Sequence, residues 1–300
     1  MPEPCAPNRA WSFEPVFQTN HPTETVIRSH IRIEDEKLPL LATAIHNGHW
    51  LPPQLSQISG ITDAQRLREE DPHTGKIAAL FPNYVVLESS RFAVDLNRPL
   101  QKSVYLNPSD CWGLQARNAP LPEAVLKKLH QDYDSWHRLM EYQIQRLLGE
   151  HPKLLVLDLH SYNHRRGGPE AEPAPQIQNP DIIIGRSNLS PTHHPAAQAL
   201  RELLNGQTWQ GKSLDCRLDI KFTGGDFPRW VNLLEPARVV CLAVEFKKTF
   251  MDEWTAELDD VAFEELILLF YHQVSRWLKE FYDIQIPLEP HFCTPRDNFC

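Results

Sequence analysis

Short, continuous apolar runs that lead directly into polar residues constrain the fold of this chain most. LPLLATAI leads into His46, KLLVL leads into residues 158–161 (DLHS), and VVCLAV leads into Glu245. A strand buried on both faces has such a run, whereas a strand with one solvated face alternates. The pattern therefore predicts an α/β fold with a buried sheet. Ligands of open α/β sheets bind beyond the carboxyl ends of the strands, where these polar residues stand.

The same patterns predict the other elements. Strands are expected at residues 39–45, 84–87, 92–96, 153–159, 181–184, 216–222 and 239–245. Helices are expected at residues 62–70, 122–149, 195–204 and 258–281. No internal repeat or shift in composition divides the chain, so residues 1–300 are expected to form a single domain. Within it, residues 1–35 are read as an N-terminal arm or edge hairpin, and residues 285–300 as a C-terminal tail.

Composition narrows the class of protein. The net charge of −9 disfavours nucleic-acid binding, and no basic run offsets it. No stretch approaches the roughly 18 apolar residues that span a bilayer, and the N-terminus lacks the order of a signal peptide. The six cysteines form no C-x-x-C pair, so a disulfide framework or zinc ribbon is not expected. A cytoplasmic protein that binds neither nucleic acid nor membrane is predicted, and its oligomeric state is left open.

Two histidines at matching strand ends predict a metal site. A catalytic zinc site commonly has three protein ligands and one open position. His46 and His160 are the first two candidates. His49 is the favoured third ligand, because a short turn can bring it to the same metal as His46. A carboxylate from Glu70 or Asp71 is the alternative, and these ligand types suit zinc, iron or manganese.

Two carboxylates accompany these histidines. Asp158 precedes His160 by two residues, so both side chains point to the same face of a strand. Asp158 is expected either to orient the histidine by a hydrogen bond or to be an ordinary strand-end aspartate. Glu245 follows a buried strand and needs a partner. That partner is either a metal-bound water or a salt bridge to Lys247 or Lys248.

The cationic side of the candidate site is expected from Arg91 and from the Asp95-Leu96-Asn97-Arg98 segment. An arginine can hold a substrate carboxylate with two parallel hydrogen bonds, or stabilise a developing oxyanion. The long polar segment at residues 164–180 follows the His160 strand. It is either a lid over the site or a surface connection. The G-x-S-x-G motif is absent, so a serine hydrolase is disfavoured.

Taken in order, these motifs resemble the N-formylglutamate amidohydrolase family, also called N-formylglutamate deformylases. The resemblance spans roughly residues 40 to 260. It rests on His46-x-Gly48 with Pro52, Arg91-x-x-x-Asp95-x-Asn97-Arg98, Asp158-x-His160-Ser161, Gly224-Gly225, and Glu245 through Met251-Asp252-Glu253. The chain departs from the family pattern in two places. Gly75 stands where an acidic residue is often found, and Phe246-Lys247-Lys248 stands where many relatives carry Asn-Arg-Arg.

The resemblance implies a central mixed sheet flanked by helices, similar to zinc carboxypeptidases and aspartoacylases, with one zinc ion per chain. It implies hydrolysis of an N-acyl amide, in particular an N-formyl amide, on an acidic amino acid such as N-formylglutamate. A small anionic N-acyl amino acid is therefore the expected partner. By position, His46 and His160 would be metal ligands and Glu245 the general base. Arg98 with Asn97 would bind the substrate carboxylate.

By the same resemblance, Arg91 would polarise the scissile carbonyl. Two other functions stay open. One is an aspartoacylase-like or carboxypeptidase-like hydrolase with another N-acyl substrate. The other is a protein of the same fold that binds a metal or ligand without turnover, which the altered segments at Gly75 and Lys247-Lys248 would suit.

Overall fold

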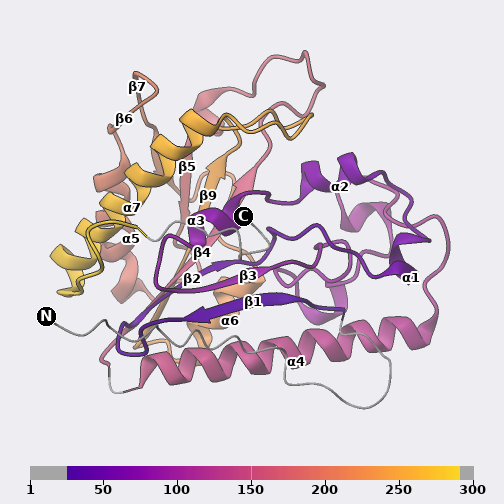
Figure 1. The fold of residues 1–300 in the computed structure, drawn as a ribbon, viewed down its shortest axis with the longest axis horizontal. Helices are drawn as coiled ribbons and strands as arrows, with labels where there is room; N and C mark the ends of the chain where they lie inside the picture. Colours follow the sequence, from indigo (N-terminus) through magenta and orange to yellow (C-terminus); the bar gives the residue numbers. More distant parts are fainter. Residues whose placement is uncertain (1–25, 150, 291–300) are drawn as a thin grey trace, which may run out of the picture.

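A mixed seven-stranded sheet forms the centre of the computed structural model, which describes residues 26–149 and 151–290 (Figure 1). The strand order in this sheet is β1-β3-β2-β4-β9-β5-β8. Its strands are β1 (Ser29–Ile33), β2 (Leu40–Ala44), β3 (Asn83–Leu87), β4 (Leu154–Tyr162), β5 (Ile182–Gly185), β8 (Cys216–Leu218) and β9 (Val239–Lys247). A separate small ribbon is made by β6 (Thr208–Trp209) and β7 (Lys212–Ser213).

The central strands run parallel, so their carboxyl ends meet at one edge of the sheet. β2 pairs in parallel with β3 and with β4, and β4 pairs in parallel with β9. The outer pairs β1–β3 and β5–β9 are antiparallel, which makes the sheet mixed. Every residue of β2, β3 and β4 is buried, as expected for strands covered on both faces. The predicted α/β domain with a mixed sheet flanked by helices is confirmed.

Helices cover both faces of this sheet. They are α1 (Pro53–Ser56), α2 (Asp63–Glu69), α3 (Thr74–Ala78), α4 (Glu123–Leu148), α5 (His194–Leu204), α6 (Asp226–Leu234) and α7 (Asp260–Tyr282). Helices α4 and α6 share a hydrophobic core with one face, and α3, α5 and α7 share a core with the other (Figure 1). No helix in the described part of the chain is both long and apolar enough to cross a membrane.

The long helix α4 follows the predicted pattern closely. Leu129, Trp136, Met140 and Ile144 are all buried and recur at intervals of seven and four, so one stripe of the helix faces the sheet. The helix ends at Gly149, which has a positive φ of 39° that favours glycine. The prediction of a helix over residues 122–149 is confirmed.

The predicted strand at residues 92–96 is wrong. This segment is a turn, in which Ala93 N–H donates to the carbonyl of Ser90 and Asp95 N–H donates to the carbonyl of Ser103. Residues 92–96 are all buried, including the apparently alternating ones. Their alternation therefore did not reflect one buried and one solvated face, which is the basis of a strand prediction.

The predicted strand at residues 216–222 is shorter than expected. Strand β8 ends at Leu218, because Asp219 and Lys221 have positive φ angles of 55° and 64°. A strand cannot continue through such a left-handed conformation. The chain turns here, and residues 221–225 line the pocket described below.

The two predicted ends of the chain are only partly described. Residues 1–25 of the expected N-terminal arm lie outside the described residues, and Ser29–Ile33 forms the edge strand β1. Residues 291–300 of the expected C-terminal tail also lie outside them. The tail and arm therefore stay predictions.

Candidate metal centre and active-site pocket

The neighbouring strands β2, β4 and β9 bring the predicted chemical residues to one edge of the sheet. His46 follows β2 by two residues, and His160 lies near the end of β4. Glu245 on β9 is directly opposite His160 in the parallel register. Strand pairing thus brings together residues that are far apart in the sequence and that the apolar runs had placed at strand ends.

His46, Asp71 and His160 form a buried cluster that can hold a metal ion. One ligand atom from each residue lies within 4.8 Å of the others. Asp71 Oδ2 is 3.0 Å from His160 Nδ1 and 3.5 Å from His46 Nδ1. His46 Nδ1 is buried and has no hydrogen-bond partner among residues 26–149 and 151–290, which is costly for a polar atom. Two imidazoles and one carboxylate match a common zinc donor set, so the residues present fit a divalent metal.

Carboxylates behind the two imidazoles orient them. His46 Nε2 is 2.7 Å from Asp95 Oδ1, and His160 Nε2 is 2.8 Å from Asp158 Oδ2. The Thr43 hydroxyl donates to the other oxygen of Asp158 at 2.9 Å. A ring nitrogen that donates to a carboxylate leaves the other nitrogen as the metal ligand. Both histidines therefore direct Nδ1 towards Asp71.

Asp95 is itself fixed by several donors. Arg91 Nη2 donates to it at 2.9 Å, the backbone N–H of Asn97 donates at 2.9 Å, and the Tyr105 hydroxyl also donates. Burial alone would raise the pKa of Asp95, but the Arg91 guanidinium and His46 hold it well below its usual range. Asp95 therefore stays ionised and can accept a hydrogen bond from His46 Nε2.

Of the candidates for the third metal ligand, Asp71 lies with His46 and His160, and His49 does not. His49 Nδ1 is 2.5 Å from Glu70 Oε2, and its Nε2 is 3.1 Å from Arg66 Nη2. Both of its ring nitrogens thus contact other side chains. The backbone N–H of Asp71 donates to the carbonyl of His46 at 2.9 Å, which brings the two residues together.

Glu245 has an environment unlike that of the other carboxylates. Among the described residues, none forms a hydrogen bond or ion pair with its side chain, so the predicted salt bridge to Lys247 or Lys248 is absent there. Burial raises the pKa of Glu245 to about 7, with the negative charges of Asp71 and Asp158 adding to the effect and His160 opposing it. A carboxylate with such a pKa can both accept and release a proton near neutral pH.

Asn97 and Arg98 lie on the wall of the same pocket. Asn97 Oδ1 accepts the backbone N–H of Phe227 at 3.0 Å, which leaves its Nδ2 as the group available to a ligand. Gly225 allows this contact, because a Cβ at that position would meet Asn97 Oδ1 at 2.1 Å. Within the described part of the chain, the Arg98 side chain has only a long contact with Asp95, at 3.8 Å, and it is 43% exposed.

Arg91 also lines the pocket, and its guanidinium is held in place on three sides. Nε donates to Tyr105, Nη1 to the carbonyl of Glu69, and Nη2 to Asp95. A guanidinium has five N–H donors, so these contacts leave others for a ligand. The structure thus places Arg91 beside the metal cluster with a fixed orientation.

The pocket has a volume of about 300 Å³ and also contains residues that the sequence did not single out. These are Glu69, Trp112, Tyr162, Asn163, Arg166, Lys221, Phe222 and Thr223. Lys221 was missed because its segment was read as a strand. A larger cavity of about 810 Å³ lies at the amino-terminal ends of β2 and β4, beside the end of α7. The metal-ligand cluster found in the described residues is not part of it.

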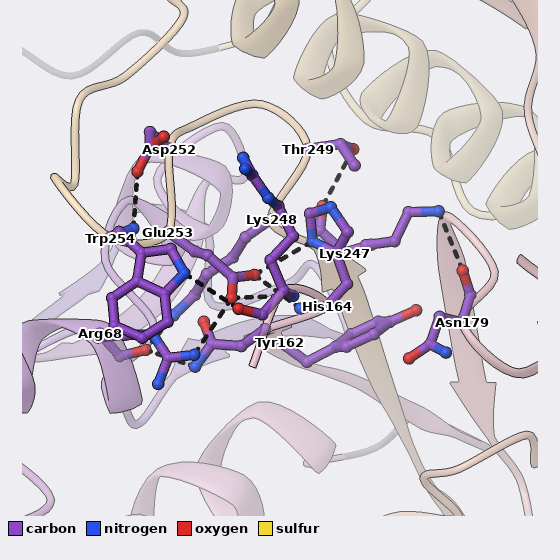
Figure 2. A network of polar contacts seen from close by, with 12 residues as sticks. Arg68, Tyr162, His164, Asn179, Lys247, Lys248, Thr249, Asp252, Glu253 and Trp254 are labelled. Atoms are coloured by element: carbon purple, nitrogen blue, oxygen red, sulfur yellow. Dashed lines mark hydrogen bonds and ion pairs between the residues drawn. The ribbon is translucent and has the colours of Figure 1, made fainter. Parts of the chain in front are cut away.

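The segment predicted as a lid or surface connection is fastened at its base. Glu253 accepts the backbone N–H groups of His164 and Arg165 at 2.7 and 2.9 Å, and Trp254 Nε1 donates to the carbonyl of Arg165 at 3.0 Å (Figure 2). The next residue, Arg166, forms two parallel hydrogen bonds with Glu69 at 3.1 and 2.9 Å. The base of the loop is therefore part of the pocket wall, and closure of the loop as a lid stays a prediction.

Comparisons with known proteins agree with this fold. The family model described as N-formylglutamate amidohydrolase matches residues 38–251. The solved N-formylglutamate amidohydrolase from Ralstonia eutropha JMP134 is 16% identical, with a TM-score of 0.63 over 86% of this chain and 99% of that one. A gene product from Agrobacterium tumefaciens is also 16% identical, with a TM-score of 0.58 over 84% of this chain and 96% of that one. A search of curated proteins finds no match.

Proposed function

The chain belongs to the N-formylglutamate amidohydrolase family, and on that premise we propose that it is a zinc-dependent amidohydrolase. Its substrate would be an N-formyl amide of an acidic amino acid, such as N-formylglutamate. The observation that carries the proposal is the buried cluster of His46, Asp71 and His160 next to Glu245. The three ligands would hold one zinc ion per chain.

Zinc in this cluster would supply Lewis acidity to the amide carbonyl and to a water molecule. The role of Glu245 is to accept the proton of the attacking water. It then gives that proton to the amine nitrogen as the C–N bond breaks, which yields formate and the free amino acid. Its raised pKa supports both halves of this transfer.

Arg98 and Asn97 would hold the α-carboxylate of the substrate. The exposed guanidinium of Arg98 and the available Nδ2 of Asn97 support this role. Arg91 would donate to the carbonyl oxygen as negative charge develops on it. Its three fixed contacts support this role, because a donor that is already oriented needs no reorganisation during the reaction.

An acidic side chain on the substrate is supported by Lys221. Its ammonium lines the pocket and donates to Asn179 Oδ1 at 2.8 Å, and no carboxylate of the described residues lies within ion-pair distance. The ammonium also donates to the carbonyl of Asn163 at 3.4 Å, and since it carries three donors, one stays available for a second carboxylate. An aspartoacylase-like or carboxypeptidase-like activity on another N-acyl substrate is the alternative, because the same chemistry serves it.

Two measurements test the proposal together. Elemental analysis of purified protein is expected to find about one zinc per chain, lost in His46→Ala and His160→Ala. A substrate panel of N-formylglutamate, N-acetylglutamate, N-acetylaspartate and a peptide is expected to show the highest kcat/KM for N-formylglutamate. A preference for another compound of the panel would instead favour the aspartoacylase-like or carboxypeptidase-like activity. Zinc binding without turnover of any compound would favour a protein of the same fold that binds a metal without catalysis. Absence of zinc would refute the metal assignment.

A further inference from the structure

Lys248 is a fully buried lysine at the carboxyl end of β9, where only 1% of the residue is exposed. Among the described residues, no carboxylate lies within ion-pair distance of its ammonium. Burying a charge without a counter-ion is costly, so the contacts that its ammonium makes need an explanation. Figure 2 shows Lys248 between the turn that carries Glu253 and the end of the strand that carries Tyr162.

The ammonium of Lys248 binds two backbone carbonyls at the end of α2. Nζ donates to the carbonyl of Arg68 at 2.8 Å and to the carbonyl of Glu70 at 2.7 Å. The last carbonyls of a helix lack partners within the helix and carry partial negative charge. A cation is therefore favourable here. The backbone N–H of Lys248 also donates to the carbonyl of Tyr162 at 3.0 Å, which ties the lysine to β4.

These contacts fix the peptide group between Glu70 and Asp71, which positions the Asp71 side chain beside His46 and His160. The carbonyl of Glu70 and the N–H of Asp71 belong to the same planar peptide. Lys248 binds the carbonyl, and the N–H donates to the carbonyl of His46 at 2.9 Å. With both ends of the peptide held, the position of the Asp71 side chain relative to His46 and His160 is restricted.

We propose that Lys248 is a positioning residue for the metal site: it holds the Glu70–Asp71 peptide so that the Asp71 carboxylate meets the two imidazoles. The inference rests on the metal site of the proposed function and not on its substrate. Lys248 is one of the residues that line the pocket, but in this role it does not bind the metal itself. It acts through the backbone of a ligand, as hydrogen-bond partners of ligands do in other metal sites.

The test is the zinc affinity of the Lys248→Met variant, measured by competition with a chromogenic chelator. Methionine has a similar length but cannot donate, so both carbonyls lose their partner. Zinc affinity is expected to fall about 10- to 100-fold, the usual effect of removing an outer partner of a ligand. Lys248→Arg is expected to recover part of the affinity, because a guanidinium can donate to both carbonyls.

Lys247→Met is the matched control. Lys247 is also a buried lysine, at 5% exposure, but its ammonium contacts Asp181 at 2.6 Å and the carbonyl of Asn179 at 3.0 Å, away from the cluster. Its loss is expected to lower the melting temperature of the metal-free protein and to leave zinc affinity within about threefold of the wild type. A purely structural role of Lys248 would give the same result for both lysines, with stability reduced and zinc affinity retained.

Zinc affinity in Lys248→Met equal to that of the control would overturn the proposal. If Lys248→Met does not fold, Lys248→Gln replaces it, because its amide keeps the site polar while its reach is shorter. Wild-type zinc affinity in a folded Lys248→Gln would likewise overturn the proposal. Since no substrate is present, absence of deformylase activity does not affect the result. A wild-type protein that binds no zinc would instead refute the metal site itself.

Discussion

Two glutamates only eight positions apart in the sequence lie in opposite environments. Glu245, beside the cluster of His46, Asp71 and His160, has a pKa raised by burial to about 7. Burial would also raise the pKa of Glu253, but hydrogen bonds from His164 and from the backbone N–H groups of His164 and Arg165 lower it to about 2. The difference lies in the donors directed at each carboxylate, since both are buried or partly buried.

This contrast separates a carboxylate that can exchange protons from one that holds structure. A carboxylate that accepts several N–H groups stays ionised and fixes the segments that donate to it. A carboxylate with few donors and acidic neighbours binds a proton readily. Asp95, which accepts several donors and orients His46, is a carboxylate of the kind that stays ionised and holds structure. Substitutions can test each half of the comparison.

The largest effect is expected for Glu245→Gln. If Glu245 transfers the proton, kcat should fall by on the order of 10²–10⁴-fold, because an amide cannot accept a proton from water. Zinc content and melting temperature should stay close to those of the wild type, since no described donor depends on this carboxylate. Steady-state kinetics on the preferred substrate checks the change, with Glu253→Gln as the matched comparison. Equal losses of kcat in the two variants would contradict the assignment of proton transfer to Glu245 and of a structural role to Glu253.

The next effect is expected for Asp158→Asn. Its oxygens bind His160 Nε2 and the Thr43 hydroxyl, so an amide there weakens the orientation of the imidazole. Zinc affinity should fall about 10- to 100-fold. Chelator competition measures the fall, and Glu253→Gln should keep the wild-type affinity. An unchanged affinity in Asp158→Asn would mean that Asp158 is an ordinary strand-end aspartate.

A change in stability with pH is expected for Glu253. Its pKa in the folded protein is about 2, below the ordinary value of 4.5, so its stabilisation is present above pH 4.5 and is lost as the pH falls towards 2. Glu253→Gln should lower the free energy of unfolding by on the order of 2 kcal/mol at pH 7. Urea unfolding at pH 7 and pH 3 should show a smaller difference between the two proteins at pH 3. A difference that does not depend on pH would contradict this explanation.

The smallest effect is expected for His49→Ala. His49 contacts Glu70 and Arg66, and 39% of its side chain is exposed. The variant should keep full zinc content and lose on the order of 1 kcal/mol of stability, since the buried Glu70 carboxylate loses this partner but keeps Ser90 and Arg66. Elemental analysis beside Asp71→Ala, which should lose zinc, separates the two candidate ligands. Loss of zinc in His49→Ala alone would assign that role to His49.

Much of the fold could be predicted because burial leaves a local pattern. The apolar runs before His46 and Glu245 predicted buried strands, and the stripe on α4 predicted its length. The strand proposed at residues 92–96 failed, because a fully buried turn can have the same alternation. Periodicity indicates which residues are buried, but the hydrogen-bond partners of the backbone decide between a strand and a turn.

The site was less accessible to prediction because long-range contacts build it. His49 is near His46 in the sequence, but Asp71 is the carboxylate that a backbone hydrogen bond to His46 brings into the cluster. Asp95 accepts a hydrogen bond from His46, but the sequence indicates it only as part of the segment that contains Asn97 and Arg98. Nothing local in the sequence indicates that Lys248 is buried or that it binds the end of α2.

The parallel pairing of β2, β4 and β9 has a consequence for how the protein matures. His160 and Asp71 are 89 positions apart in the sequence, and Glu245 follows on a third strand. A chain still being synthesised has no arrangement of ligands until these strands have paired, so tight metal capture should come late in folding. The ion would then bind the finished sheet and not the unfolded chain, and its binding free energy would add to the stability of the native state. Supply of the metal would thereby influence how long the completed protein persists in its folded form.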